Sequence, residues 1–233
     1  MMGAFATTHW SVIVRAADSQ TPEAAFAMEQ LCRTYWYPLY AFARRRGHSH
    51  EDASDLTQAF FVRFLEKHYL RSVDSKMGKF RTFMLTSMTH FLANEWDKAR
   101  AQRRGGGCQF VSFDAAAAEE RYRLEPIHHA TPEWIFERHW AQSLIGAVLD
   151  KLADETCEQR FEVLKRFLLD YKGSLSYDDA AAALGISVAA VGSAIRRMRE
   201  RFRVLLCMEV ANTVEDPAGV EPELRHLLEV LSQ

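Results

Sequence analysis

The chain has 233 residues, which suits one large domain or two small ones. Its hydrophobic content of 48% excludes a disordered protein, and a formal net charge of −2 does not by itself indicate nucleic acid as a partner. The basic residues are clustered, however, at residues 44–46, 98–104 and 196–203. Local basic patches of this kind are what DNA contacts require.

Four cysteines, Cys32, Cys108, Cys157 and Cys207, are scattered along the chain without a CxxC pair. This pattern is typical of reduced thiols in a cytoplasmic protein. The first ten residues lack the basic start and apolar core of a signal peptide. No apolar run approaches the about 18 residues that a membrane span needs. We therefore expect a cytoplasmic protein with no membrane partner.

Nearly all hydrophobic periodicity lies near 3.6 residues, which predicts an all-α fold. Long helices are expected at residues 22–46, 51–69 and 79–104, with a turn at 47–50 and a polar loop at 73–78. Three glycines at 105–107 end the third helix. Thr131, Pro132 and Glu133 then form a helix start, and four helices are expected from there to residue 206.

These helices predict two helical domains, at residues 1–104 and 133–208. A linker with little core of its own is expected at 105–132, and an acidic helical extension at 209–233. In the extension, one face is expected to pack on the protein's own domains. It comprises Leu224, Leu227, Leu228 and Leu231.

Residues 176–206 read as a short Ala-rich helix, a turn at Gly185 and a longer helix that starts after Ser187 as N-cap. The longer helix carries an apolar stripe, composed of Val188, Val191, Ile195, Met198, Phe202 and Leu205. Arginines, at 196, 197, 199, 201 and 203, lie beside or opposite this stripe. An ordinary amphipathic surface helix could carry the same arginines on its solvent-exposed face. The short helix and the glycine turn favour a helix-turn-helix, which places one face of its second helix in the DNA major groove.

Three blocks of the chain resemble bacterial RNA polymerase sigma factors of the extracytoplasmic-function (ECF) group. They read DASDLTQAFFVRFLEK, FRTFMLTSMTHFLANEWDKARAQRR and LSYDDAAAALGISVAAVGSAIRRMRERFR. The resemblance covers almost the whole chain. It implies that the first block docks on a coiled coil of the polymerase clamp, the second melts and recognises the −10 element, and the third recognises the −35 element.

The resemblance implies core RNA polymerase and promoter DNA as partners, a regulator such as an anti-sigma factor or a protein kinase, and no cofactor. Candidate polymerase contacts are Asp52, Asp55, Leu56, Gln58, Phe61 and Arg63. Candidate −10 contacts are Lys79, Arg81, His90, Asn94, Lys98, Arg100 and Arg103, with the loop 67–78 as a possible base pocket. Candidate −35 contacts are Ser187, Ala189, Ser193, Arg196, Arg197 and Arg199.

The chain departs from the family pattern in places. Ser54 stands where an acid is common, Gly192 and Ala194 stand where Lys or Arg is common, and Ala189-Ala190 stands where Gly-Thr is common. The arginines of the last helix are therefore expected to contact mainly phosphates. Phosphorylation of Ser54 or Thr57 would restore negative charge to the docking helix, and it is a further hypothesis.

Two other functions remain open from the residues. One is a stand-alone helix-turn-helix repressor with an N-terminal effector domain, dimerising through the acidic tail. The other is a metal-dependent hydrolase, whose ligands would come from His48, His50, Glu51, Asp52 and Asp55. Those acids lie at a helix start, where caps and dipole partners are expected. No nucleotide-binding or nucleophile motif is present. We favour a transcription initiation factor that is not an enzyme.

Overall fold

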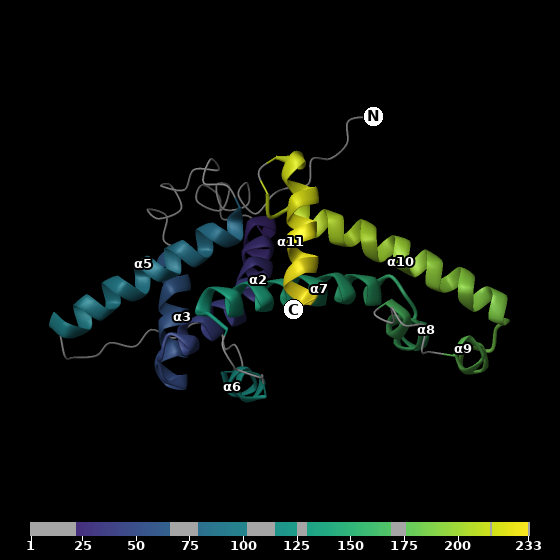
Figure 1. Ribbon diagram of the computed structural model, residues 1–233, viewed down its shortest axis with the longest axis horizontal. Helices are drawn as coiled ribbons and strands as arrows, with labels where there is room; N and C mark the ends of the chain where they lie inside the picture. The colour runs from purple at the N-terminus through teal and green to yellow at the C-terminus, as the bar shows by residue number, and fades with distance from the viewer. Residues whose placement is uncertain are drawn as a thin grey trace. The chain divides into compact units, whose positions relative to one another are not determined.

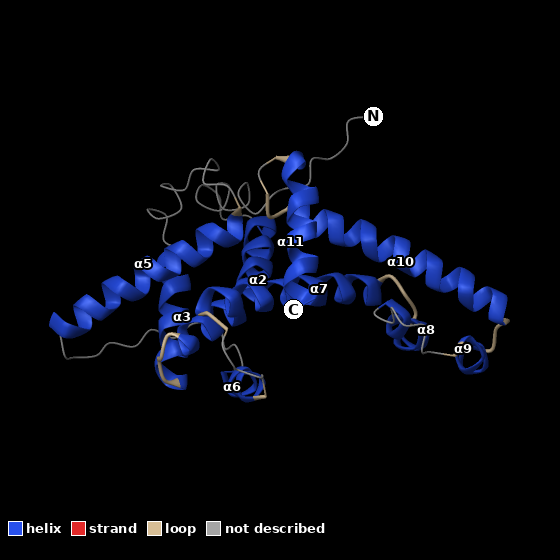
Figure 2. Cartoon of the chain, viewed as in Figure 1, coloured by secondary structure: helices blue, strands red, loops and turns tan. Residues whose placement is uncertain are grey.

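A computed structural model describes residues 22–65, 79–101, 115–124, 130–168, 176–214 and 216–232. Within these ranges all regular structure is helical, as Figure 2 shows, and the predicted all-α class is confirmed. The chain divides into two compact units, one of Met1–Ser143 with Ala211–Gln233 and one of Leu144–Val210.

The first unit contains three long helices that follow the sequence prediction closely (Figure 1). They are α2 (Pro22–Arg45), α3 (His50–Leu65) and α5 (Phe80–Ala101). It also holds α6 (Ala115–Arg123), the first part of α7 (Pro132–Asp154), the 3-10 turn η3 (Pro217–Gly219) and α11 (Val220–Ser232). The N-cap predicted for α7 is confirmed, because the Thr131 hydroxyl accepts from the Trp134 amide at 3.2 Å.

Aromatic side chains form the core of this unit. Tyr35 of α2 is fully buried, and its hydroxyl accepts a hydrogen bond from the indole of Trp140 at 3.2 Å. Phe60 of α3 meets Phe91 of α5 edge to face, with ring centroids 5.7 Å apart. Each fully buried aromatic side chain contributes about 1.5–3 kcal/mol. The Phe60–Phe91 contact joins α3 and α5, the two helices that carry the candidate polymerase and −10 residues.

The predicted linker contains a helix with a buried face. Glu119 of α6 is 6% exposed, and its carboxylate accepts from the Tyr40 hydroxyl at 2.7 Å and from the Arg44 guanidinium at 3.0 Å. Ala118 and Tyr122 are buried beside it. Residues 115–123 of the linker, which was expected to have little core of its own, therefore contribute buried side chains. Alanine has the highest helix propensity, so the alanine run carried the signal.

The second unit contains the rest of α7, then α8 (Glu158–Leu164), the 3-10 turn η2 (Lys165–Leu168), α9 (Tyr177–Leu184) and α10 up to Val210. The caps predicted at Gly185 and Ser187 are confirmed, and Ser176 caps α9, which the sequence analysis did not predict. The Ser176 hydroxyl accepts from the Asp179 amide, and the Ser187 hydroxyl accepts from the Ala190 amide, each at 3.2 Å. Gly185 ends α9 with φ 64°, a left-handed conformation that glycine adopts without strain.

Helix α10 runs from Val188 to Ala211, beyond the predicted end at residue 206. Its buried face comprises Val191, Ala194, Ile195, Met198, Leu205, Leu206 and Val210. Val188 is 42% exposed and Phe202 is half-buried, so the predicted stripe is right at its centre but not throughout.

The boundaries between the two compact units lie at residues 143/144 and 210/211. The sequence had instead predicted a linker between domains at residues 105–132. The difference arises because Tyr122, Phe136 and Trp140 are all buried in the first unit, so α6 and the first part of α7 belong to it. The acidic extension from Ala211 also belongs to this unit. The functional division of the chain into domains stays a prediction.

Among the residues described, no single helix is long and apolar enough to cross a membrane. One bent pair, Tyr177–Leu184 with Val188–Thr213, meets the criteria of length and composition jointly, and its two helices meet at 95°. This pair is the helix-turn-helix itself.

Candidate nucleic-acid and partner interfaces

The outward face of α3 carries acidic residues. Asp52 and Asp55 lie three residues apart and are both exposed, so they share one helix face. The Ser49 hydroxyl accepts from the Asp52 amide at 3.0 Å and donates to the Asp52 carboxylate at 2.7 Å, which fixes the start of the helix. Leu56 and Gln58 are half-buried. This face presents negative charge to a basic partner surface.

Phe61 does not belong to that face. It is 6% exposed and packs edge to face against Phe60, with centroids 5.6 Å apart. It follows Thr57 by four residues and shares the buried side of α3, so its burial does not support the prediction of a polymerase contact.

Burial argues against the phosphorylation hypothesis, which stays a prediction. Thr57 is 0% exposed, and its hydroxyl donates to the Ala53 carbonyl at 2.7 Å. Ser54 is 7% exposed. A phosphate adds about −1.5 to −2 charge, which the apolar side of α3 would have to hold without solvation. Both residues are buried in this folded state, so phosphorylation would require local opening around α3.

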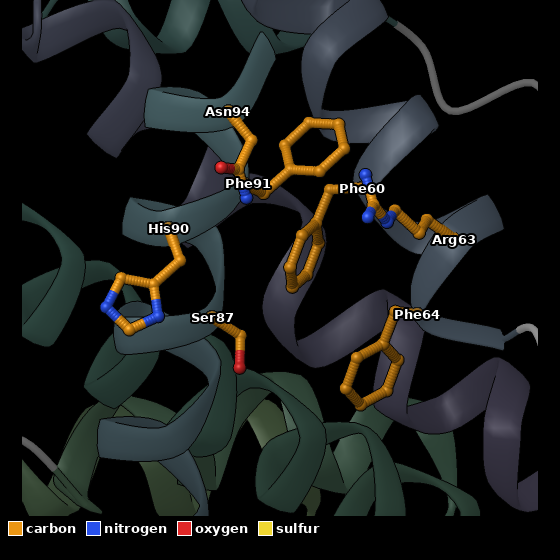
Figure 3. Close-up of a pocket in the computed structure, with 7 residues that line it drawn as sticks. All are labelled: Phe60, Arg63, Phe64, Ser87, His90, Phe91 and Asn94. Carbon is orange, nitrogen blue, oxygen red and sulfur yellow. The ribbon is translucent and has the colours of Figure 1, made fainter. Parts of the chain in front are cut away.

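A pocket of about 230 Å³ lies between α3 and α5 (Figure 3). Its lining comprises Phe60, Arg63, Phe64, Ser87, His90, Phe91 and Asn94. Figure 3 shows His90 and Asn94 on one helix, across the pocket from Arg63 on the other. Aromatic walls with polar groups at the rim suit stacking of, and hydrogen bonding to, a single nucleic-acid base.

The pocket brings together two predicted −10 residues, His90 and Asn94, both exposed. It adds Ser87, which the sequence analysis did not single out, and Arg63, which was assigned to polymerase. Arg63 lies 3.8 Å from Glu95 of α5. The i, i+4 spacing of His90 and Asn94 was the signal available for their pairing, whereas the contribution of Arg63 depends on tertiary packing.

Lys79 and Arg81, at the start of α5, contact residues of the same chain. The Lys79 ammonium lies 2.7 Å from the Glu223 carboxylate, and the Arg81 guanidinium donates to the same carboxylate at 2.6 Å. Arg81 also pairs with Glu137 and lies 5.1 Å from the ring centre of Trp140. At 5% exposure, Arg81 is a buried ion-pair residue, and its assignment as a DNA contact does not fit this state.

The remaining predicted −10 residues are described only in part. Lys98 and Arg100 lie within α5, and their side chains are outside the described set. Arg103 and the loop 67–78 lie outside the described residues altogether.

The ionisation of Glu223 should make the stability of the contacts at the start of α5 depend on pH. Burial would raise its pKa, but hydrogen bonds and charges from Arg81 and Lys79 lower the pKa below its ordinary value of 4.5. A lowered pKa gives stability that is present above the ordinary value and is lost as pH falls through the lowered one. We expect the melting temperature of the wild type to exceed that of Glu223→Gln at pH 7, with the difference shrinking below about pH 4.5. A difference that does not change with pH would contradict this linkage.

The predicted −35 residues lie on α10 and the turn before it. Ser187, Ala189, Arg196 and Arg197 are exposed, and Ser193 is half-buried. Arg199 is exposed, but its guanidinium donates to the Phe167 carbonyl at 2.7 Å. Arg199 therefore ties α10 to η2, and Arg196 and Arg197 are the predicted arginines that face solvent on this helix without a contact of that kind.

Within the described ranges, no three His, Cys, Asp or Glu side chains are grouped closely enough to hold a metal ion. His50 instead lies 2.8 Å from the Tyr40 hydroxyl and 3.7 Å from Glu119. The acids proposed as metal ligands with it are exposed on α3.

A family model described as ECF sigma factor matches residues 14–207. The ECF RNA polymerase sigma factor SigE of Mycolicibacterium smegmatis is 28% identical over 200 residues, which cover 85% of this chain and 69% of that protein. No solved structure matches the chain. Because the family match spans most of the residues, including α3, α5 and the helix-turn-helix, the chain belongs to the ECF sigma factor family, whose members are transcription initiation factors.

Proposed function

We propose that this sigma factor docks on core RNA polymerase through the acidic face of α3, reads the −35 duplex with α10, and holds melted −10 DNA at the α3–α5 pocket. The observation that carries the proposal is the exposed pair Arg196 and Arg197, on the side of α10 away from Val191 and Ile195. A helix-turn-helix that buries one face and presents arginines on the other is built to lie in the major groove.

The −10 role rests on the pocket between α3 and α5. At about 230 Å³ it is smaller than a typical small-molecule site of about 300–1,000 Å³, and it suits one base. Phe60, Phe64 and Phe91 supply flat apolar surfaces, and His90 and Asn94 supply hydrogen-bonding groups. Capture of one unstacked base would offset part of the cost of melting the duplex.

The repressor alternative has less support. It used the acidic tail as a dimer helix, but α11 buries Leu227 completely within its own chain. We propose that the protein works in the cytoplasm, where polymerase and promoter DNA are found. An anti-sigma factor acting on this chain would have to cover the α3 face or the exposed side of α10.

The docking role of α3 is tested by Asp55→Arg. We expect at least about a tenfold loss of affinity for core polymerase, because losing one partner of a charge pair buried in an interface costs about 2 kcal/mol or more, and reversal adds repulsion. The control is Glu29→Arg, an equal charge change at an exposed residue of α2. Both variants should keep the wild-type melting temperature, since exposed substitutions change stability little. Equal affinity of the two variants, in a fluorescence titration with core enzyme, would remove α3 as the docking helix.

A further inference from the structure

The C-terminal segment occupies the start of α5. The Glu223 carboxylate, 0% exposed, binds both Lys79 and Arg81. The backbone amide of Phe80 donates to the Thr213 carbonyl at 3.1 Å. Lys79 and the first turn of α5, which the sequence assigns to the −10 strand, are therefore held by the protein's own tail.

Helix α11 itself has a small interface, and Thr213 and Val214, which precede it in the tail, are also buried. Of the 13 residues of α11, the buried ones are Glu223, Leu227 and Val230. His226 adds a contact of 3.1 Å to Glu137. Elements with few buried apolar contacts open at a low free-energy cost compared with global unfolding. Helix α11 can therefore leave while the aromatic core around Tyr35 and Trp140 stays packed.

The charges at the start of α5 change when α11 leaves. With α11 docked, the cations of Lys79 and Arg81 are balanced by Glu223 and Glu137. Without α11, Glu137 alone faces them, and one positive charge is in excess. The start of a helix also favours anions, because its first N–H groups have no partner within the helix.

We propose that α11 and single-stranded promoter DNA compete for the start of α5, so that the tail is a tethered inhibitor of the −10 surface. The Glu223 carboxylate takes the position that a backbone phosphate would occupy on Lys79. This inference rests on the proposed −10 role of α5. Coupling between two ligands of one site is reciprocal, so docking of α11 weakens DNA binding by the factor by which DNA weakens docking.

The first test measures binding of the free full-length chain to a fluorescent, mixed-sequence, single-stranded oligonucleotide. Leu227→Ala and Glu223→Gln should bind about fivefold tighter or more than the wild type. Matched controls are Leu228→Ala, at a side chain 57% exposed, and Glu221→Gln, at one 78% exposed; both should bind as the wild type does. Adding Lys79→Ala to Leu227→Ala should abolish the gain.

Salt dependence sharpens this test. The logarithm of the binding constant falls linearly with the logarithm of the salt concentration. For single strands, each additional phosphate contact makes this slope steeper by about 0.7. Leu227→Ala should show that increase, and the double variant with Lys79→Ala should lose it. An unchanged slope with unchanged affinity would overturn the competition.

A second test uses the unaltered protein and does not depend on how the variants fold. Hydrogen exchange of the α11 amides should accelerate when the oligonucleotide is added, whereas exchange in α2 should not change. Unaltered exchange in α11 at saturating oligonucleotide would overturn the proposal. A separate experiment tests the −10 role itself. If that role were wrong, the wild type with core polymerase would give no promoter-specific transcription.

Discussion

Replacing Arg196 and Arg197 with alanine together is expected to reduce transcription from promoters of this sigma factor by about 30-fold or more. Each lost groove contact costs about 1–3 kcal/mol, and about 1.4 kcal/mol corresponds to a factor of ten. Both side chains are exposed on the face of α10 away from its buried residues, so the substitutions remove contacts to DNA without opening the core.

The control removes the same charge from elsewhere in the second unit. Arg160 and Arg166 are exposed on α8 and η2, and their double alanine variant should retain most activity. The measurement is run-off transcription with core polymerase, repeated on templates with substituted −35 elements. If the variant discriminates less between the −35 sequences, the lost contact was to a base. If transcription falls by the same factor on all templates, the lost contact was to a phosphate. Equal loss in both double variants would mean that α10 is not the −35 reader.

Arg81→Ala is expected to lower the free energy of unfolding by about 3–5 kcal/mol. The substitution leaves the carboxylate of Glu223 buried with Lys79 as its remaining cation and takes a partner from Glu137. It also removes the contact with Trp140, 5.1 Å from the guanidinium. Burial alone would lower the pKa of Arg81, but Glu223 and Glu137 raise the pKa above its ordinary value, so the group stays charged.

Arg33→Ala is the matched control in urea denaturation. Arg33 forms an i, i+4 ion pair with Glu29 at 2.7 Å, and both side chains are more than half exposed. Exposed pairs of this kind contribute about 0–1 kcal/mol. A small, equal loss in Arg33→Ala and Arg81→Ala would show that the Arg81 cluster does not hold the tail to the first unit.

Local chemistry made the helices and their caps predictable. Gly185 and Ser187 act as caps, as the sequence indicates, because cap and turn preferences depend on near neighbours. The exposure of Asp52 and Asp55 also follows from periodicity. The alanine run of α6 carried a helix signal, although its burial against Tyr40 and Arg44 depends on residues 75 and 79 positions away.

The role of Arg81 could not be predicted in this way. Its partners Glu137 and Glu223 lie 56 and 142 positions along the chain, and basic composition at a helix start looks the same for a DNA contact. The same distant partners explain the error in α11. Leucine periodicity favoured Leu228 and Leu231, which are exposed, whereas Glu223 is buried because Lys79 and Arg81 pair with it.

Start-site-specific transcription by the purified chain with core RNA polymerase tests the sigma-factor role most directly. On a library of genomic fragments from its source, the mixture should give transcripts from a small set of start sites that share −35 and −10 elements. Core polymerase alone, and core polymerase with the Arg196→Ala, Arg197→Ala variant, should not give them. Transcripts identical with and without the chain would contradict promoter recognition by this protein. Tight sequence-specific binding to duplex DNA without polymerase would then favour a repressor.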